Sequence, residues 1–200
     1  MKLFYSAASP FVRKVMVSAA ELRLDFERLP SAANPVTRDQ TIVAKNPLGQ
    51  VPTLITDDGA VLYDSRVICE YLNDLAAGSL FPASGPARWQ ARTEQALGDG
   101  ILAAGVLVRY ETVLRPKEKY WPDWRDGQMD KIRCGLDQIA GWAPGFRDRV
   151  DIGTITIGCL LGWLDFRYAD LEWRQGRDPL AAWYATFSKR PSMTATEPHA

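Results

Sequence analysis

The hydrophobic pattern of this 200-residue chain changes across residues 78–86, and that change constrains the fold more than any other feature. Before this segment, short apolar runs alternate with stretches whose apolar residues recur at helical spacing, whereas after it only the helical spacing recurs. The segment itself (GSLFPASGP) is rich in residues that interrupt regular structure. The sequence therefore predicts two domains, residues 1–77 and 87–200, joined by a linker at 78–86.

The first domain is predicted to contain both strands and helices. Ser9 and Asp64 can each cap a helix N-terminus, and a loop with a short helix is expected over residues 31–44. A tight turn at 57–59 (Asp-Asp-Gly) is typical of a hairpin. Four β-rich runs are expected to form strands, namely residues 2–5, 25–29, 51–56 and 60–63. The resulting order, βαβαββα, predicts a mixed sheet covered by helices.

The second domain is predicted to be all-helical, because its apolar residues keep a helical period and no strand alternation is visible. Four helical stretches are expected, over residues 97–108, 129–139, 155–167 and 180–189. The fold class is therefore α+β followed by α: a domain with a mixed sheet and then an all-α domain.

Charge and composition exclude several classes of function. Lysine plus arginine equals aspartate plus glutamate, 24 each, so the formal net charge is zero. A nucleic-acid partner or a polybasic membrane anchor would require a basic excess, and no run of apolar residues is long enough to span a membrane. The one histidine, His199, lies next to the C-terminal residue. We therefore expect neither histidine-based catalysis nor a metal site.

The cysteines indicate a reducing compartment. The sequence contains three cysteines: Cys69, Cys134 and Cys159. Their number is odd, their spacing is wide and no C-x-x-C pair occurs, so no zinc site or dithiol site is predicted. Each lies in an apolar helical stretch, and we expect three buried, reduced thiols. The apolar run at the N-terminus stops at Ser6, and the basic pair at residues 13–14 interrupts any signal-peptide core. A cytoplasmic location is therefore expected.

Ser9 stands at the junction between the first predicted strand and the first predicted helix. It can act simply as the helix cap. The same position also lets its hydroxyl donate a hydrogen bond to an anion, since a helix N-terminus offers free N–H groups and partial positive charge. No basic partner is visible nearby in the sequence, so a nucleophilic role is not favoured. Ser6 is a weaker candidate, because it precedes the junction.

Two further segments can serve either structure or binding. Pro52 opens a predicted strand, and a cis bond after Val51 would turn the preceding backbone toward a ligand, although the trans form is the more common one. Asp64 and Ser65 stand at another predicted helix N-terminus. They can be a simple cap, or they can bind a ligand that carries both a carboxylate and an ammonium group.

Taken together, these segments resemble the cytosolic glutathione transferases, of the bacterial serine type. The resemblance rests on residues 9–14 (SPFVRK), 46–54 (NPLGQVPTL) and 64–72 (DSRVICEYL), and on the final motif at 190–192 (RPS). It covers nearly the whole chain and is most specific in the first domain. The resemblance implies a thioredoxin-like N-terminal domain, an all-α C-terminal domain, a homodimer and glutathione as co-substrate.

The resemblance also implies roles for individual residues in glutathione binding. The backbone of Val51 would pair with the cysteinyl part of glutathione, beside a cis proline. Asp64 and Ser65 would hold its γ-glutamyl end, and Gln50 would approach the other carboxylate. Asn34 can contribute, although the loop around it matches the family poorly.

Ser9 falls where serine-type members keep the residue that activates the thiol of glutathione. Cysteine-type members have cysteine there, so stable mixed disulfides are not expected. In the second domain, Tyr110 and Trp121 are candidates for binding the electrophilic substrate, and a packing role is equally open for each. The sequence departs from the family pattern in two places. Arg66 directly follows Ser65, and the usual Ser/Thr cap followed three residues later by Asp is reversed to Asp151 and Thr154, where Asp151 can still cap a helix.

The function predicted from these features is transfer of glutathione to a small electrophile. Two alternatives stay open: a non-catalytic protein that uses the same fold for protein–protein contact, and a glutathione-dependent peroxidase or reductive dehalogenase. A scaffold need not keep all three glutathione-binding segments.

Overall fold

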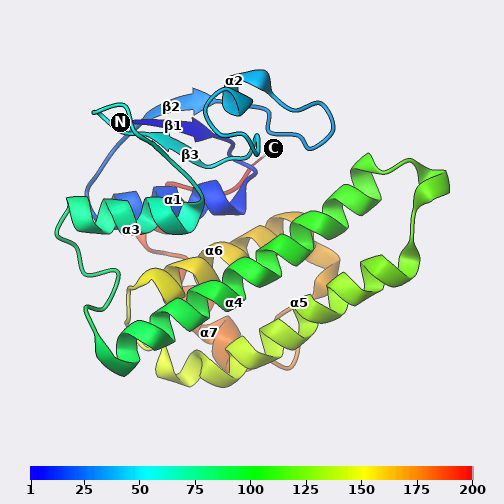
Figure 1. Ribbon diagram of the computed structural model, residues 1–200. Helices are drawn as coiled ribbons and strands as arrows, with labels where there is room; N and C mark the ends of the chain where they lie inside the picture. The colour runs from blue at the N-terminus through cyan, green and yellow to red at the C-terminus, as the bar shows by residue number, and fades with distance from the viewer. Residues whose placement is uncertain (200) are drawn as a thin grey trace. The chain divides into compact units, whose positions relative to one another are not determined.

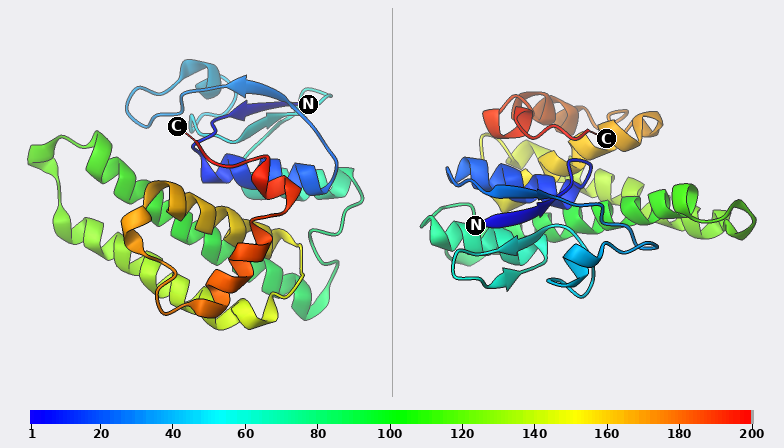
Figure 2. Two further views of the ribbon diagram at one scale, coloured as in Figure 1. Left: turned by 180° about the vertical axis from the view of Figure 1, so that it is seen from behind. Right: turned by 90° about the horizontal axis from the view of Figure 1, so that it is seen from above.

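The computed structural model of the protein describes residues 1–199 and divides into two compact units. The first unit contains Met1–Arg88 together with the chain from Lys189 onward, and the second contains Trp89–Ser188. The sequence assigns the final segment to the helical domain, and the structure instead groups it with the first unit. The reason is that helix α8 (Pro191–Thr194) returns to lie beside helix α1 (Pro10–Glu21), as the red and blue ribbons show (Figure 2).

A four-stranded mixed sheet forms the centre of the first unit, in the order β2-β1-β3-β4 (Figure 1). Strand β1 pairs in parallel with β2 and antiparallel with β3, and β3 pairs antiparallel with β4. The strands are β1 (Lys2–Tyr5), β2 (Glu27–Pro30), β3 (Thr53–Ile55) and β4 (Val61–Leu62). The predicted mixed sheet is therefore confirmed, with the later strands shorter than expected.

Helices α1 and α3 (Ser65–Leu75) pack together under one face of this sheet, and the short helix α2 (Gln40–Val43) lies on the other side (Figure 1). The observed order of elements, βαβαββα, is the predicted one. Apolar side chains from the sheet and both helices are fully buried and form the core; they include Leu3, Val15, Leu54, Ile68 and Leu72.

The second unit is entirely helical within the described residues, as predicted. It begins inside the 25-residue helix α4, and a π-helical turn named η1 follows directly. The helical elements are α4 (Gly85–Arg109), η1 (Tyr110–Leu114), η2 (Lys117–Lys119), α5 (Pro122–Trp142), η3 (Ala143–Gly145), α6 (Ile152–Arg167), η4 (Ala169–Leu171) and α7 (Asp178–Phe187). The linker therefore ends before Gly85, two residues earlier than predicted.

A capping box begins helix α6. The Asp151 carboxylate accepts from the backbone N–H groups of Gly153 and Thr154, at 3.0 and 3.1 Å, and the Thr154 hydroxyl accepts from the Asp151 N–H at 3.0 Å. The two residue types are exchanged relative to the usual capping box, yet the reciprocal pairing survives. The expectation that Asp151 caps this helix is confirmed.

Helices α4 and α6 approach each other closely at glycines. A Cβ atom added to Gly98 would lie 2.8 Å from the Thr156 side chain, and one added to Gly105 would lie 2.6 Å from the Trp163 ring. Neither glycine has room for a side chain. The G-x-G stretch at residues 98–100 therefore lies inside a helix and serves helix packing.

The prediction that all three cysteines are buried is wrong for one of them. Cys69 and Cys159 are buried, whereas Cys134 is exposed, and none of the three forms a disulfide within residues 1–199. The apolar stripe of α5 runs through Ile132 and Leu136, and Cys134 lies midway between them, about 200° around the helix from each. Among the helices of residues 1–199, none combines the length and hydrophobicity that a bilayer crossing requires.

Candidate functional site

The sheet topology brings four predicted binding segments to one edge of the sheet. Strands β1 and β2 are parallel, so both end at this edge. Strand β3 runs antiparallel to β1 and therefore starts there, and β4 runs antiparallel to β3 and therefore ends there. The segments at this edge are residues 6–9 after β1, 31–34 after β2, 50–52 before β3 and 63–65 after β4.

Ser9 caps helix α1 at this edge. Its hydroxyl oxygen accepts from the backbone N–H of Val12 at 3.3 Å, and its own N–H donates to the Ser6 carbonyl at 3.1 Å. A serine hydroxyl that accepts one hydrogen bond keeps its own proton free to donate. The first turn of α1 contains no acidic residue. The position therefore combines a free O–H donor with the positive end of a 12-residue helix, which suits an anion.

The segment before β3 is held by two buried polar side chains that the sequence did not single out. The Asn46 side-chain amide donates to the Gln50 carbonyl at 3.3 Å and to the Thr53 hydroxyl at 2.9 Å, and Thr53 donates to the same Gln50 carbonyl at 2.8 Å. Asn46 is 1% exposed and Thr53 is fully buried. The Val51–Pro52 peptide bond that follows is cis, as the family resemblance implied. Gln50 is exposed and Val51 half-buried, so this segment is presented at the surface.

Asp64 and Ser65 begin helix α3. The Asp64 carboxylate accepts from the backbone N–H of Arg66 at 2.9 Å and remains exposed, whereas Ser65 is 2% exposed. Asp64 is thus confirmed as the N-cap. One carboxylate oxygen serves the cap, and the exposed carboxylate has the charge that an ammonium group requires.

Asn34 uses its side chain within its own loop. Its carboxamide oxygen accepts from the N–H groups of Val36 and Thr37, at 2.8 and 3.1 Å. The loop thus has a fixed local turn. Asn34 lies at the same edge of the sheet as Ser9, and its role in glutathione binding stays a prediction.

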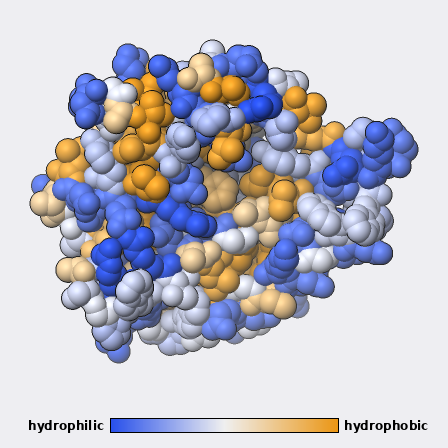
Figure 3. All heavy atoms as spheres, viewed as in Figure 1, coloured by the Kyte–Doolittle hydropathy of each residue, from blue (hydrophilic) through white to orange (hydrophobic). Residues whose placement is uncertain are grey.

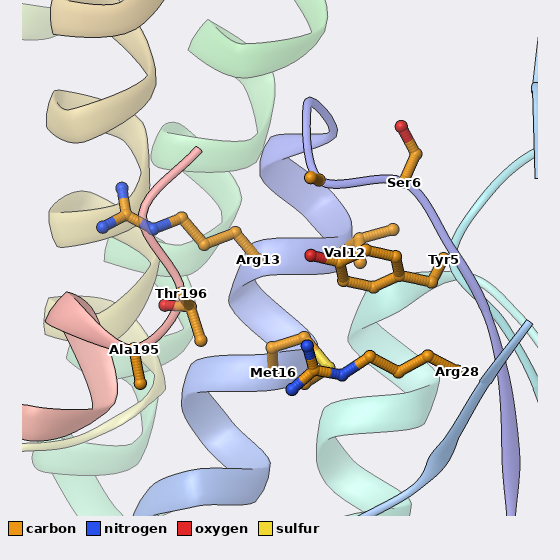
Figure 4. A pocket seen from close by; sticks show the side chains of 9 residues that line it. Tyr5, Ser6, Val12, Arg13, Met16, Arg28, Ala195 and Thr196 are labelled. Carbon is orange, nitrogen blue, oxygen red and sulfur yellow. The ribbon is translucent and has the colours of Figure 1, made fainter. Parts of the chain in front are cut away.

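A small pocket opens beside the β1–α1 junction, and Ser9 does not line it (Figure 4). Tyr5 and Arg28 lie on one side, with the Arg28 guanidinium 5.4 Å from the centre of the Tyr5 ring, and Arg13 reaches past Thr196 on the other (Figure 4). Arg13 is 5% exposed and donates to the Met193 carbonyl at 3.1 Å. Arg13 therefore connects α1 to the C-terminal segment.

Tyr110 and Trp121 lie at the two ends of the segment that joins α4 to α5. Tyr110 starts the π-helical turn η1 and is half-buried; burial raises the pKa of its hydroxyl, against the opposing positive charge of Arg109. The Trp121 side chain is 60% exposed, and its backbone N–H donates to the Glu111 carboxylate at 3.0 Å. Between them the chain is strongly hydrophilic at its surface (Figure 3), and Glu111 also accepts from Arg115 at 2.5 Å. Glu111, which the sequence did not single out, therefore anchors this segment.

No group of three or more histidine, cysteine, aspartate or glutamate side chains within residues 1–199 is placed to hold a metal ion. The polar groups at the sheet edge are instead hydroxyls, backbone amides and one exposed carboxylate. Such groups suit a zwitterionic peptide that carries both carboxylates and an ammonium group.

A thioredoxin-like unit followed by an all-helical unit, with a serine at the first helix N-terminus and a cis proline before β3, defines the class of the glutathione transferases. Comparison with known families gives the same class. Residues 8–75 match the model for the glutathione S-transferase N-terminal domain, and residues 122–186 match the model for the C-terminal domain. The chain belongs to the glutathione transferase family.

The similarity to known relatives and to solved structures extends over nearly the whole chain. The GST-like protein YibF of Escherichia coli K12 is 34% identical over 99% of this chain and 98% of its own length. A glutathione transferase family member from Pseudomonas fluorescens Pf-5, crystallised with bound glutathione, is 48% identical, has a TM-score of 0.95 and matches 100% of this chain and 99% of its own. A second crystal structure of a glutathione transferase family member from this strain contains S-(propanoic acid)-glutathione, with 47% identity, a TM-score of 0.92 and 99% coverage of both chains.

Proposed function

We propose that the protein is a glutathione transferase in which Ser9 stabilises the thiolate of bound glutathione for attack on a small electrophile. The observation that carries the proposal is the convergence, at one edge of the sheet, of Ser9, the segment at 50–52 and the Asp64–Ser65 helix start. Each of these segments carries a group that is complementary to a different part of glutathione.

The proposed binding mode follows from those groups. The backbone at Val51, just before β3, can pair with the cysteinyl backbone of glutathione, as a strand pairs with an added peptide. Ser65 and the N-terminus of α3 suit the γ-glutamyl carboxylate, and Asp64 suits its ammonium group. The exposed side chain of Gln50, and Asn34 nearby at the same edge, can donate to the glycyl carboxylate.

Ser9 and helix α1 together can supply the required change in the pKa of the thiol. A free thiol has a pKa of about 8.5, so only a few per cent is thiolate at neutral pH. A hydrogen bond to a charged group contributes roughly 1.5–3 kcal/mol and a helix terminus about 0.3–1 kcal/mol. At about 1.36 kcal/mol per pKa unit, the pair lowers the thiol pKa by roughly one to three units.

The acceptor is proposed to bind to the helical unit, where Tyr110 and Trp121 are the sequence-based candidates. The adduct in the Pseudomonas fluorescens structure is a thioether of glutathione, which is the type of product that a transferase makes. This supports transfer over a purely structural use of the fold. We also propose that the protein acts in the cytoplasm and forms a homodimer. Light scattering on the purified protein tests the dimer.

The deciding experiment measures glutathione binding by calorimetry and the pKa of the bound thiol by thiolate absorbance, in the wild type, Ser9→Ala and Ser6→Ala. The wild type is expected to bind glutathione with a lowered thiol pKa. Ser9→Ala is expected to raise that pKa and lower kcat for an aryl halide at least tenfold, since it removes the larger of the two contributions. Ser6→Ala, the matched control, is expected to leave the thiol pKa unchanged.

Other outcomes would contradict the proposal in different ways. An unchanged pKa in Ser9→Ala would remove Ser9 from the mechanism. A higher turnover of hydroperoxides than of aryl halides would identify a peroxidase. No binding at millimolar glutathione would contradict an enzymatic role and favour a protein-interaction module.

A further inference from the structure

An arginine-rich cluster lies where α4 and α6 end in the helical unit. The Tyr168 hydroxyl, just after α6, donates to the Gly105 carbonyl of α4 at 2.6 Å, so the ends of the two helices are side by side. Arg109 lies four residues beyond Gly105, on the same helix face, and Arg167 immediately precedes Tyr168. Both arginines are therefore brought to one place, and both are half-buried.

These two arginines have no carboxylate partner of their own. Within residues 1–199, neither Arg109 nor Arg167 forms an ion pair. The Arg167 guanidinium lies 3.8 Å from the centre of the Phe166 ring, and Asp165, the nearest carboxylate along the helix, is bound by Arg174 at 2.6 Å. The cluster thus holds positive charge that the described protein does not neutralise.

A third arginine, Arg125, lies near Tyr168 but already has a carboxylate partner. Arg125 of α5 forms an ion pair with Asp126, yet its Nε atom is buried and has no hydrogen-bond partner. The positive charges of Arg125, Arg109 and Arg167 all act on the Tyr168 hydroxyl and favour a lower pKa. Burial raises the pKa of Tyr168 to about 12, against the opposing effect of Arg109, so its hydroxyl keeps its proton. Burial also lowers the pKa of Arg167, and the positive charge of Arg109 lowers it further.

The surroundings of the cluster suit an organic anion rather than a free inorganic one. Tyr110 follows Arg109 directly and starts the π-helical turn η1, a feature that is frequent at functional sites. Phe166 stacks beside the Arg167 guanidinium, and the Tyr168 ring follows it directly in the chain. Arginine binds carboxylates through paired hydrogen bonds and stacks on aromatic rings, so this combination fits a carboxylate attached to a flat, apolar body.

We propose that Arg109 and Arg167 bind a carboxylate on the acceptor, so that the electrophiles used by this protein are carboxylate-bearing molecules. This inference rests on the proposed transferase function. With an aryl halide, the thiolate sulfur forms a bond to the ring carbon, the carbon–halogen bond breaks, and the halogen leaves with the electron pair as halide. The carboxylate itself changes no bonds and is held by the arginines.

The test compares two acceptors of the same shape, 4-chloro-3-nitrobenzoate, which carries a carboxylate, and 4-chloro-3-nitrobenzamide, which carries a neutral amide. Each enzymatic rate is divided by the rate of the uncatalysed reaction of the same acceptor with glutathione. The wild type is expected to favour the acid at least tenfold in kcat/KM. Arg109→Gln and Arg167→Gln are each expected to remove most of this preference through a higher KM for the acid, with the amide unchanged. The Lys variants are expected to restore part of it, and added salt to weaken it.

Arg133→Gln is the matched control, because Arg133 is an exposed arginine of the helical unit that pairs only with Asp130 in the described structure. It is expected to keep the preference for the acid. Thermal melts check that Arg109→Gln and Arg167→Gln are folded. Their melting temperatures are expected not to fall below that of the wild type, because each variant removes one of several neighbouring positive charges. Equal enhancement of acid and amide in the wild type, or equal losses for both in the variants, would overturn the inference.

Binding of the two thioether products separates this inference from the proposed function. The carboxylate-bearing glutathione adduct is expected to bind at least tenfold more tightly than its carboxamide counterpart in the wild type and not in Arg109→Gln. Equal binding of the two adducts overturns the inference. If the adducts differ as expected but neither acceptor nor 1-chloro-2,4-dinitrobenzene is turned over, the anion site stands and the transferase function fails.

Discussion

The guanidinium of Arg149 lies 2.5 Å from the carboxylate of Glu94, a side chain that is only 1% exposed. The same guanidinium reaches Asp151 at 2.9 Å, so one arginine joins α4 to the capping box of α6. Burial of Arg149 works against its charge, and the hydrogen bonds to Asp151 and Glu94 outweigh that effect and raise its pKa. The fixed geometry of α4 against α6 therefore depends on a buried ion pair as well as on apolar packing.

Arg149→Met is expected to lower the free energy of unfolding by about 3–5 kcal/mol, because it leaves the Glu94 carboxylate buried without a positive charge beside it. The double variant Arg149→Met with Glu94→Gln is expected to recover part of this loss, since the buried side chain at position 94 then carries no charge. Chemical denaturation followed by circular dichroism measures both, with the exposed Arg133→Gln as a control within about 0.5 kcal/mol of the wild type. A double variant less stable than Arg149→Met would contradict this account.

Two glycines of α4 are expected to respond in opposite directions to the same substitution. Gly105→Ala would place a methyl group 2.6 Å from the Trp163 ring and is expected to destabilise the protein by about 1–3 kcal/mol. Gly100→Ala meets nothing within 4 Å and is expected to stabilise the helix by up to about 1 kcal/mol. Thermal melts of the two variants decide the matter, and a shift of both in the same direction would be evidence against the close contact.

Glu21 is expected to give the protein a stability that disappears in acid. Hydrogen bonds from Arg190, at 2.9 and 3.0 Å, chiefly lower the pKa of Glu21 below its ordinary value of 4.5, with help from Ser192 and against the effect of burial. Because the folded-state pKa is the lower one, the contribution is complete above the unfolded-state pKa and is lost as the pH falls through the folded-state value. Glu21→Gln is therefore expected to be less stable than the wild type at neutral pH, with the difference shrinking below about pH 4.5. A difference that stays constant from pH 7 to pH 3 would exclude this linkage.

A thiol reagent is expected to modify one cysteine in the native protein and all three after unfolding, because Cys134 is exposed while Cys69 and Cys159 are buried. Mass spectrometry after brief labelling counts the modified thiols and locates them. Cys134→Ser is expected to abolish native-state labelling. Rapid native labelling of Cys69 would contradict the packing of α3.

Helix starts were the most predictable part of this structure, because a cap depends on a few adjacent residues. Ser9, Asp64 and Asp151 all cap the helices that the sequence assigned to them. The sheet order could be predicted almost as well, since the pattern of strands, crossover helix and hairpin leaves few topologies open. Convergence of the site segments at one edge then follows from strand direction alone.

Features that depend on distant partners could not be predicted in this way. Nothing adjacent to Glu94 in the sequence indicates that Arg149 will neutralise it, and nothing near Arg109 indicates Arg167. The return of the C-terminal segment to α1 has the same origin, because the partners Glu21 and Arg190 are 169 residues apart. Cys134 is a different case: its place opposite the apolar stripe was readable from the helical period.

That return has a consequence for biosynthesis. Most of the thioredoxin-like unit precedes the helical unit in the chain, yet its closing segment is synthesised only after every helix of the second unit. A nascent chain that has exposed only the first 88 residues holds Glu21 without Arg190 and Arg13 without the Met193 carbonyl. Completion of the unit that is made first must therefore wait until the second unit has been synthesised.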